Sequence, residues 1–439
     1  MRIFFLLLDF VVFLIIAFVV LATRSSAFTT GFFIANCFVL IPAFFIITLV
    51  LLIFSFYDLK ILHKKQIKYS NLAIAFVFTF LFSSTAIYFL APIFKVVTPK
   101  TNLIFIFIIY FLYTIISRRF YIFTVKKQTN VVLIGENRTL RRLKKELLNS
   151  PYYKIIASFD SHFDDIPKET ELVVVSNYLL SNDKNLLTTV FEKFLIKDIE
   201  VKTDFVFFED LLHRTPIEGI KDSIWLFQGI TTNTINYVIF SIIKRTVDIL
   251  TSLFLLVILS PLVCLIYLLI KVIDKTNPIF TQERIGKMGI LIHIYKFRTM
   301  IPNTETVTKL GKILRNFRLD EIPQLINILK ADISFVGPRP IWNKEHQFIN
   351  KHIANNPVRT LVTPGLTGHA QLNHKAPVVY CVQDSSYFEN KNPDIVFDDA
   401  YKRLSYDIWY IKNRSIFLDF EIILKTAKRM FIKDNVLKN

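Results

Sequence analysis

The sequence predicts a membrane protein with a four-helix transmembrane bundle, a small α/β domain and a C-terminal α/β region. The 439 residues are 53% hydrophobic with a mean hydropathy of +0.44, which is too apolar for an ordinary water-soluble protein. The first 127 residues contain long apolar runs, whereas short strand-like and amphipathic stretches alternate after them. We therefore expect boundaries at 1–127, 128–230 and 231–439.

The charge and the cysteine content indicate which partners and which stabilising sites to expect. A formal net charge of +18 predicts contact with anionic lipid or an anionic substrate, although basic cytoplasmic loops alone would also explain part of it. Cys37, Cys264 and Cys381 are far apart and show no metal-binding spacing, so we infer neither a disulfide framework nor a zinc site. No feature indicates nucleic-acid binding.

Four apolar runs, at about 3–22, 32–57, 72–94 and 102–123, are each long enough to cross a bilayer. The first lacks a small-residue cleavage site, so it reads as an anchor rather than a signal peptide. Lysines and arginines follow the second and fourth runs, which predicts that both ends of the bundle lie in the cytoplasm. Asp9 is expected at the membrane interface rather than in a proton relay.

Residues 128–230 read as a Rossmann-like α/β domain with a degenerate nucleotide motif. VVLIG, KIIASFD and ELVVVS are predicted strands, with a helix near 183–196. A dinucleotide site needs a glycine-rich turn at which the backbone can approach the pyrophosphate, and only Gly135 is present. A structural or regulatory role is favoured over residual nucleotide binding.

The apolar segment 244–275 has two interpretations. Hydropathy predicts a fifth span, but both flanks are basic, which favours both ends on the cytoplasmic face. Ser260-Pro261 interrupts the run, because proline removes a helix hydrogen bond and a serine hydroxyl can satisfy the freed carbonyl. A re-entrant helix that bends there and a kinked span both remain open from the residues alone.

The segment LDEIPQLINILKADISFVGPRP carries adjacent carboxylates, Asp320 and Glu321, with Arg315 before them. Such a group can hold a magnesium ion and meet a phosphorus atom, since Mg²⁺ takes one or two carboxylates plus phosphate oxygens. An acidic pair favoured by a helix dipole is the plainer explanation.

Three motifs in this order, YKFRTM, LDEIPQLINILKADISFVGPRP and PGLTGHAQLN, follow the apolar segment with its Ser-Pro pair. Over about 244–430 the chain resembles the bacterial sugar transferase family of polyprenyl-phosphate glycosyl-1-phosphate transferases. The four spans and the α/β domain resemble its large monotopic-type subgroup. The resemblance implies a C-terminal α/β catalytic domain anchored by a re-entrant helix, with the bend at Ser260 and Pro261.

The resemblance also implies a role for each matching residue. Asp320 would be the nucleophile toward a UDP-sugar, and Glu321 would hold Mg²⁺. UMP would leave, and polyprenyl (undecaprenyl) phosphate would then take the phosphosugar from the aspartate. The implied substrate-binding residues are Lys296, Arg315, Arg339, Pro364, Gly365, Thr367 and Gln371.

Some positions depart from the family's usual pattern. Ala331 stands where a glycine is usual, and Thr363 replaces a basic residue. His369 replaces an aromatic residue, and Asn373-His374-Lys375 replaces Asn-Gly-Arg. These departures leave the identity of the sugar open.

The closing segment contains two candidate supporting residues, Asp407 and Tyr410, for which a purely structural role is the alternative. Residues 416–431 predict an interfacial amphipathic helix, with a core-packed helix as the alternative. One face carries Ile416, Phe417, Phe420, Ile423, Leu424, Ala427 and Phe431, and Lys425, Lys428 and Arg429 lie on the other side.

The function expected from these features is transfer of a sugar-1-phosphate from a UDP-sugar to undecaprenyl phosphate. It would prime exopolysaccharide, capsule or O-antigen synthesis at the cytoplasmic face of a bacterial inner membrane. A catalytically silent scaffold for polysaccharide assembly is the alternative, and a transporter is poorly supported. A homodimer is compatible with the sequence.

Overall fold

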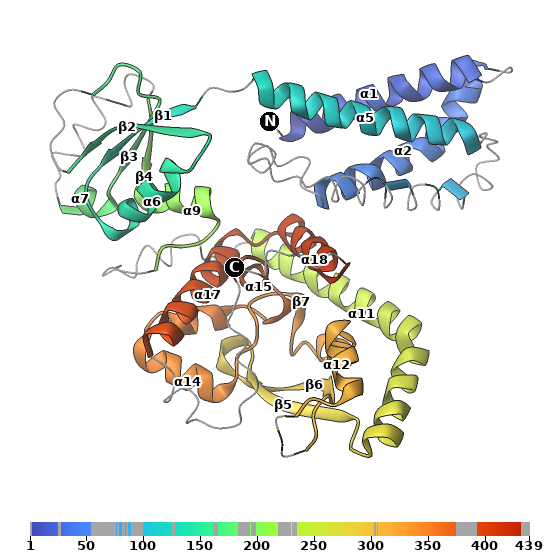
Figure 1. The fold of residues 1–439 in the computed structure, drawn as a ribbon, viewed down its shortest axis with the longest axis vertical. Helices are drawn as coiled ribbons and strands as arrows, with labels where there is room; N and C mark the ends of the chain where they lie inside the picture. Colours follow the sequence, from blue (N-terminus) through green and yellow to red (C-terminus); the bar gives the residue numbers. More distant parts are fainter. Residues whose placement is uncertain are drawn as a thin grey trace. The chain divides into compact units, whose positions relative to one another are not determined.

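The computed structural model describes the helices, strands and connections of most of the chain (Figure 1). The described residues are 2–24, 28–53, 76, 79–80, 84, 87–88, 100–124, 128–160, 166–182, 194, 199–217, 230, 235–302, 304, 306–374 and 393–431.

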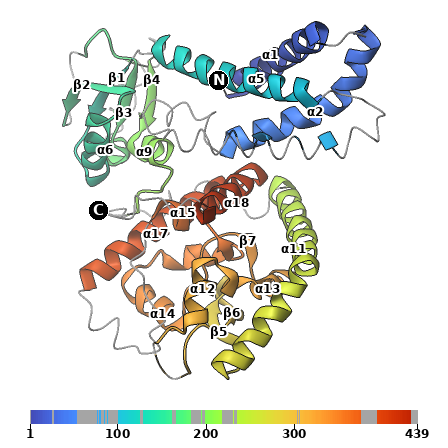
Figure 2. The same cartoon turned by 45° about the vertical axis from the view of Figure 1, so that its right-hand side comes forward.

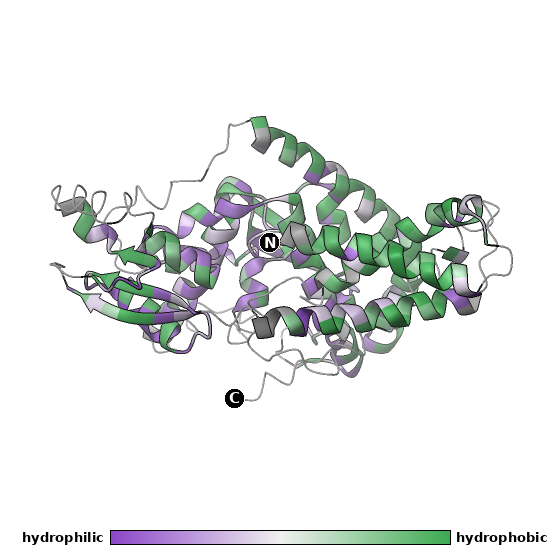
Figure 3. Ribbon diagram, turned by 90° about the horizontal axis from the view of Figure 1, so that it is seen from above, coloured by the Kyte–Doolittle hydropathy of each residue, from purple (hydrophilic) through white to green (hydrophobic). Residues whose placement is uncertain are grey.

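Three long apolar helices form the described part of the N-terminal region: α1 (Arg2–Arg24), α2 (Thr30–Ile53) and α5 (Lys100–Thr124). They are coloured as hydrophobic along most of their length in Figure 3. Within the described residues, Phe5–Arg24, Thr30–Leu49, Asn102–Phe120 and Tyr237–Asp274 are long and apolar enough to cross a membrane. These confirm three of the four predicted N-terminal runs. The fourth, 72–94, lies almost entirely outside the described residues.

A buried ion pair joins α1 to α5. Both guanidinium NH groups of Arg118 bond the Asp9 carboxylate, at 3.1 and 2.5 Å, and the two side chains are 3% and 0% exposed. Phe5 lies under the guanidinium, 4.6 Å from its ring centroid. Burial of the carboxylate is tolerated because a partner of opposite sign is present, and the predicted interfacial position of Asp9 stays a prediction.

The α/β part contains a four-stranded sheet with strand order β2-β1-β3-β4. Its strands are β1 (Thr129–Ile134), β2 (Tyr153–Phe159), β3 (Leu172–Val175) and β4 (Glu200–Thr203). Hydrogen bonds advance in the same direction from β1 to both neighbours, as in a parallel sheet. The helices here are α6 (Arg138–Leu148), α7 (Asn177–Asn182) and α9 (Asp204–Leu212). The three predicted strands are confirmed, whereas most of the helix near 183–196 lies outside the described residues.

The segment predicted to bend at Ser260-Pro261 is one 35-residue helix, α11 (Ile235–Leu269), followed by the π-helical turn η2 (Ile270–Asp274). The helix curves around the C-terminal part (Figures 1 and 2). Pro261 cannot donate to the carbonyl of Val257, and the Ser260 hydroxyl donates to that carbonyl instead, at 2.8 Å. The helix thus continues through the proline without an unsatisfied carbonyl there.

Both ends of α11 are fastened to the same domain. Near the N-terminal end, Arg245 donates to the carbonyls of Ile328 and Leu329, at 2.6 and 2.7 Å. At the C-terminal end, Asp274 accepts a hydrogen bond from Thr308 at 3.0 Å. Between these points, apolar residues on one face of the helix pack against the domain on both sides of the proline: Leu255, Leu256, Leu259, Leu262, Val263, Ile266 and Ile270.

The C-terminal part combines small sheets with helices around several apolar clusters. An antiparallel hairpin pairs β5 (Ile279–Ile285) with β6 (Leu291–Phe297) through the turn η3 (Lys287–Gly289), and β7 (Ser334–Val336) runs parallel to β8 (Gly365–Thr367). Three short elements follow the hairpin: α12 (Lys309–Asn316), η4 (Leu319–Glu321) and α13 (Gln324–Leu329). The remaining helices are α14 (Asn343–His352), η5 (Asn356–Leu361), α15 (His369–Asn373), α17 (Pro393–Asn413) and α18 (Ile416–Phe431).

Helix α18 has apolar residues on two faces. Ile422 is 1% exposed and belongs to the cluster around Val336 and Tyr410. On the outer side, Phe417 is 87% exposed and Phe420 is 41% exposed. The predicted helix is confirmed, and it combines features of both interpretations, because one face packs on the core while the other presents large apolar side chains.

Candidate active site

The acidic pair lies in a tight turn between two helices rather than at the start of one. Helix α12 begins after Thr308, whose hydroxyl accepts a hydrogen bond from the Gly311 amide. Arg318 then adopts a left-handed conformation, with φ at 57°, and reverses the chain. The 3₁₀ turn η4 follows and holds Asp320 and Glu321, and Pro323 precedes α13. This path holds the acidic pair between two packed helices.

Asp320 is partly buried, and three charged groups lie around it. Burial raises the pKa of its carboxyl most strongly, and the neighbouring Glu321 carboxylate raises it further. Lys296 and Arg315 act in the opposite direction and lower that pKa. The structure therefore brings together four of the residues that the sequence analysis selected. A further cation beside the pair would favour ionisation of both carboxylates.

Glu321 is shielded by Arg318. Their ion pair spans 3.5 Å, with the glutamate side chain 16% exposed and the arginine 57% exposed. A pair with so exposed a partner contributes little to stability and separates easily. Glu321 can consequently exchange this contact for a bound cation.

Arg315 and Lys296 are positioned by the YKFRTM strand. Arg315 Nε donates to Thr299 Oγ1 at 2.8 Å, which fixes α12 against the end of β6. Helix α12 approaches so closely that a Cβ at Gly311 would overlap the Thr299 carbonyl. The glycine in the KLGKILRN helix therefore permits the contact that places Arg315.

Asn327, in the helix that follows the acidic turn, joins α13 to β6. Its side-chain oxygen accepts from the Tyr295 amide at 2.9 Å. Its amide nitrogen donates to the His293 carbonyl at 2.7 Å and to Asp332 at 2.9 Å. Because Asn327 is fully buried, losing any of these bonds would leave a polar atom unpaired. This residue was not selected from the sequence.

The remaining predicted substrate-binding residues form a second group around β7 and β8. The Gly337 amide donates to the Thr367 carbonyl at 2.9 Å, and the Gly365 amide donates to the Pro338 carbonyl at 2.9 Å. A Cβ at Gly337, Gly365 or Gly368 would overlap backbone of the facing strand. The GPRP turn, which holds Arg339, and the PGLTG loop therefore form one closely packed unit.

Thr367 and Gln371 contact residues of α18. The hydroxyls of Thr367 and Thr426 lie 2.7 Å apart, and the Gln371 carbonyl accepts from Arg429 at 3.0 Å. The Pro364 carbonyl accepts from the Ser334 amide at 2.8 Å. These contacts show how the loop is held by its neighbours, and they do not test its predicted role.

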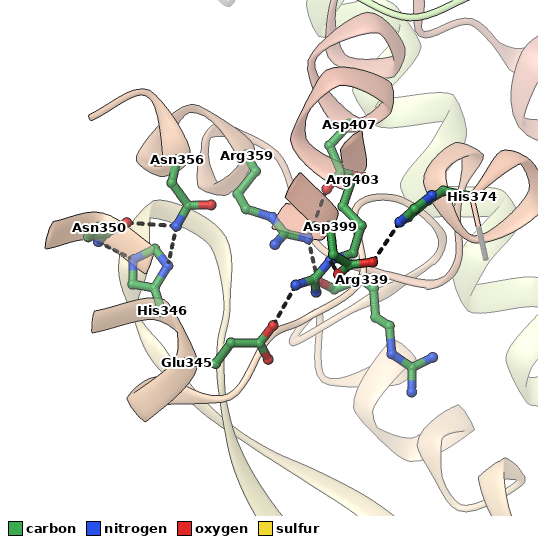
Figure 4. A network of polar contacts seen from close by, with 10 residues as sticks. All are labelled: Arg339, Glu345, His346, Asn350, Asn356, Arg359, His374, Asp399, Arg403 and Asp407. Atoms are coloured by element: carbon green, nitrogen blue, oxygen red, sulfur yellow. Dashed lines mark hydrogen bonds and ion pairs between the residues drawn. The ribbon is translucent and has the colours of Figure 1, made fainter. Parts of the chain in front are cut away.

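A buried network of charges supports the GPRP turn, and most of it escaped the sequence analysis (Figure 4). Arg359 pairs with Asp407 at 2.8 Å and donates to the Arg339 carbonyl at 3.0 Å. Beside it, Arg403 forms ion pairs with Glu345 and Asp399, both at 2.8 Å. In Figure 4 the Arg339 guanidinium points away from these pairs. The network thus holds the backbone of Arg339 and leaves its side chain for other partners.

Asp407 and Tyr410, the two candidate supporting residues, lie in different networks. Asp407 belongs to the pair with Arg359, whereas the Tyr410 hydroxyl donates to Asp419 at 2.7 Å. Asp419 also pairs with Lys244 in the N-terminal third of α11. Tyr410 therefore helps to join α17, α18 and α11.

The departures at Ala331, Thr363 and His369 fall in two places. Of the others, His374 belongs to the network in Figure 4, and Lys375 lies outside the described residues. Ala331 and Thr363 line one cavity of about 220 Å³ beside α11, together with Lys287 and Asp248. His369 lies instead in an aromatic cluster, with its ring 4.5 Å from that of Trp409. The histidine keeps the aromatic packing expected at its position.

Comparisons with known proteins fit this arrangement. The profile of the family described as bacterial sugar transferase matches residues 239–433, which hold both groups of candidate residues. A UDP-glucose:undecaprenyl-phosphate glucose-1-phosphate transferase from Caulobacter vibrioides is 31% identical over 204 residues, 44% of this chain and 71% of that protein. The chain belongs to the bacterial sugar transferase family.

Two further relatives have higher identity but are longer proteins. One is a UDP-N-acetylgalactosamine-undecaprenyl-phosphate N-acetylgalactosaminephosphotransferase from Aeromonas hydrophila, 34% identical over 43% of this chain and 44% of the relative. The other is an undecaprenyl-phosphate galactose phosphotransferase from Salmonella typhimurium, 32% identical over 44% of this chain and 41% of the relative. The match spans less than half of both relatives, and the sugars in the three names differ.

Proposed function

We propose that this chain transfers a sugar-1-phosphate from a UDP-sugar to undecaprenyl phosphate at the cytoplasmic face of a bacterial inner membrane. The observation that carries the proposal is the convergence of Asp320, Glu321, Lys296 and Arg315 within the matched region. The names of the relatives add the chemistry, since all three describe phosphotransferases that act on undecaprenyl phosphate. The step would prime the synthesis of a surface polysaccharide.

Asp320 is the proposed nucleophile in a two-step displacement. Its carboxylate oxygen attacks the β-phosphorus of the UDP-sugar, the bond to the bridging oxygen breaks, and UMP leaves with that oxygen. A phosphate oxygen of undecaprenyl phosphate then attacks the same phosphorus and displaces the carboxylate. The lipid diphosphosugar departs and Asp320 is regenerated. A covalent intermediate divides one difficult transfer between two anions into two easier ones.

The cations of the site offset the negative charge that collects during each step. Lys296 and Arg315 lie on the Asp320 side, and we propose that Arg339 binds a substrate phosphate from the GPRP turn. Arginine suits this role because its planar fork matches the geometry of two phosphate oxygens. Such fixed charges stabilise a phosphoryl transition state without reorganisation.

The donor set of the acidic pair fits a magnesium ion. The described residues contain no group of three or more His, Cys, Asp or Glu side chains that could hold a metal, so they do not offer a site built from protein ligands alone. Mg²⁺ needs only one or two carboxylates and fills its shell with water and phosphate oxygens. Glu321 would hold it, and the bound ion would supply Lewis-acid stabilisation of the diphosphate.

The contacts of α11 support a re-entrant placement in the membrane. A helix rises 1.5 Å per residue, so the 30 residues from Lys244 to Asp274 would span about 45 Å if straight. That length exceeds the ~30 Å hydrocarbon core, yet both residues contact the same domain. We infer that both ends of α11 lie at one face of the membrane and that the exposed apolar side of α18 rests in its interface.

The decisive experiment compares Asp320→Asn with the wild type. Purified full-length protein in nanodiscs, with Mg²⁺ and undecaprenyl phosphate, is incubated with a panel of UDP-sugars, and UMP release is measured. We expect Asp320→Asn to lower UMP release by about three orders of magnitude or more. Asp398→Asn, which removes a surface carboxylate that is 54% exposed, is the matched control.

A second readout addresses the covalent step. Without the lipid acceptor, radiolabel from the sugar phosphate should stay on the wild-type chain and be absent from Asp320→Asn. Wild-type rates of UMP release by Asp320→Asn would refute the proposed nucleophile. Release of UMP from no UDP-sugar at all would favour the scaffold alternative.

A further inference from the structure

Helix α9 is anchored at its N-terminal end by polar contacts at the carboxyl-end edge of the sheet. Asp204, fully buried, accepts hydrogen bonds from Asn137 Nδ2 at 2.5 Å and from the Asn177 amide at 2.9 Å. Asn137 also donates to Ser176 at 2.8 Å. These residues follow the carboxyl ends of β1, β3 and β4, the edge at which open α/β sheets bind ligands. Side chains of the domain itself occupy the positions around Gly135.

The other end of α9 is fastened to the catalytic domain. Glu209 forms an ion pair with Lys412 of α17 at 3.1 Å, and this lysine side chain is only 8% exposed. Thr215, fully buried, donates its hydroxyl to Glu209 at 2.5 Å and its amide to the Ser405 carbonyl at 3.0 Å. The Ser405 hydroxyl donates back to the Thr215 carbonyl. The contact is buried and its polar groups are paired, as in a permanent interface.

The same end of α9 reaches the PGLTG loop through His369. The C-cap residue His213 has φ at 51°, which turns its carbonyl toward His369, and His369 Nε2 donates to it at 2.8 Å. His369 follows Gly368 directly, and that glycine packs on the Gly337 carbonyl of the GPRP turn. A continuous series of contacts therefore leads from α9 to the backbone beside Arg339.

We propose that the α/β domain positions the PGLTG loop through α9, which we call the brace. His369 is the positioning residue in the loop, and the Glu209–Lys412 ion pair fixes the brace to α17. The inference rests on the proposed function only for its kinetic readout. It assigns the α/β domain a mechanical role in donor binding in place of nucleotide binding. The nine residues of α9 transmit the position of one domain to the other because both ends are fixed by buried polar contacts.

The test compares two substitutions that lie next to each other on α9. Glu209→Gln removes the charge that holds Lys412, whereas Asp210→Asn removes a carboxylate that is 50% exposed and pairs with Lys202. Amide hydrogen exchange of full-length protein in nanodiscs is followed for residues 365–374. We expect faster exchange there in Glu209→Gln and wild-type exchange in Asp210→Asn, with unchanged exchange of β1 and β3 in both.

Kinetics then separate positioning from general damage. Glu209→Gln should raise the KM for the UDP-sugar about fivefold and change kcat less than twofold. Thr215→Val, which deletes the hydroxyl bonded to Glu209, should have the same effect. Adding His369→Phe to Glu209→Gln should raise KM no further than either change alone, because both act through one series of contacts.

Equal exchange and equal KM in Glu209→Gln and Asp210→Asn would overturn the brace, as would additive effects in the double variant. The exchange comparison needs no turnover. It therefore decides the inference even for a chain that releases no UMP, in which case the proposed function alone would fail.

Discussion

Ala331 is a non-glycine residue in a left-handed backbone conformation, with φ at 69°. A Cβ in this conformation crowds the following carbonyl and costs roughly 1–2 kcal/mol. A glycine avoids that cost but loses about 0.5–1 kcal/mol of backbone entropy on folding. The usual glycine at this position is thus explained by the turn that follows α13.

Ala331→Gly should raise the free energy of unfolding by about 0.5–1 kcal/mol, since relief of the strain exceeds the entropy loss. Thermal unfolding in detergent would show a higher midpoint. Ala370→Gly, in helix α15, is the control and should lower the midpoint. A lower midpoint for Ala331→Gly would contradict the strain argument.

His369 gives the fold an acid-sensitive point. Burial lowers its pKa from 6.5 to about 4, and the groups acting on it are the His213 carbonyl and ring, Lys425 and Glu421. Above pH 6.5 the histidine is neutral in both the folded and the unfolded chain, so its titration does not reduce the free energy of unfolding there. As the pH falls from 6.5 toward 4, His369 is protonated in the unfolded chain but stays neutral in the folded chain. The free energy of unfolding therefore falls by up to about 3 kcal/mol.

The matching experiment measures unfolding midpoints between pH 7 and 4 for the wild type and His369→Phe. The phenylalanine keeps the ring packing on Trp409 and cannot titrate, so its midpoint should fall less steeply over this interval. Parallel curves for both proteins would exclude His369 as the titrating group.

Sequence motifs were sufficient to select Asp320, Glu321, Lys296 and Arg315, which the structure brings together. They could not select Arg359, Arg403 or Asn327, because the motifs do not reveal burial or the partners that burial requires. The pairing of Asp9 with Arg118 was missed for the same reason, since the two residues lie 109 positions apart. The catalytic roles stay predictions, and the identity of the sugar stays open.

At the scale of elements, the approach of α12 to the YKFRTM strand depends on Gly311. A side chain there overlaps the Thr299 backbone and must push the helix away. Such overpacking typically costs about 1–3 kcal/mol. Arg315 would move with the helix and lose its bond to Thr299.

Gly311→Ala should therefore lower both the unfolding midpoint and UMP release, the latter by at least about tenfold. Gly289→Ala is the matched control, because φ there is 79° but no atom lies within 4 Å of the added Cβ. It should cost about 1 kcal/mol and leave UMP release unchanged. Equal activity of the two variants would show that α12 does not set the geometry of the site.

The spacing of hydrophobic residues predicted where most helices and strands lie, but not the backbone conformation at their ends. The strands of the α/β sheet and helix α18 lie where their patterns place them, while β4 has too short a pattern to be recognised. Asp320 and Glu321 lie in a 3₁₀ turn because Arg318 reverses the chain before them. The left-handed conformation of an arginine cannot be predicted from the spacing of hydrophobic residues. The continuity of α11 through Pro261 likewise depends on one serine hydroxyl.

For the whole molecule, the placement of α11 decides on which side of the membrane its flanks lie. Exposed residues lie on both flanks, and Ile235 at the start of α11 and Thr281 in β5 are suitable positions for labelling. Local pattern leaves both topologies open, and the contacts of both helix ends with one domain favour the re-entrant form. Orientation, the 1–127, 128–230 and 231–439 boundaries and a homodimer stay predictions.

Ile235→Cys and Thr281→Cys, each placed in a chain whose native cysteines are replaced by serine, should react with an impermeant maleimide from the same side. Inverted vesicles would expose both positions and intact cells neither. Labelling of the two positions from opposite sides would show that α11 spans the membrane and would refute the re-entrant placement.

The pair between Asp9 and Arg118 has a consequence for the order of events during synthesis. The ribosome adds about 5–20 residues per second, so the 109 residues between the two take roughly 5–20 s to make. During that time α1 has been made and its partner has not. An unpaired carboxylate is costly to bury in lipid, so we expect the first helix to stay at the aqueous edge of the bilayer or beside the insertion machinery during this time. On this view α1 reaches its final position only after α5 has been made.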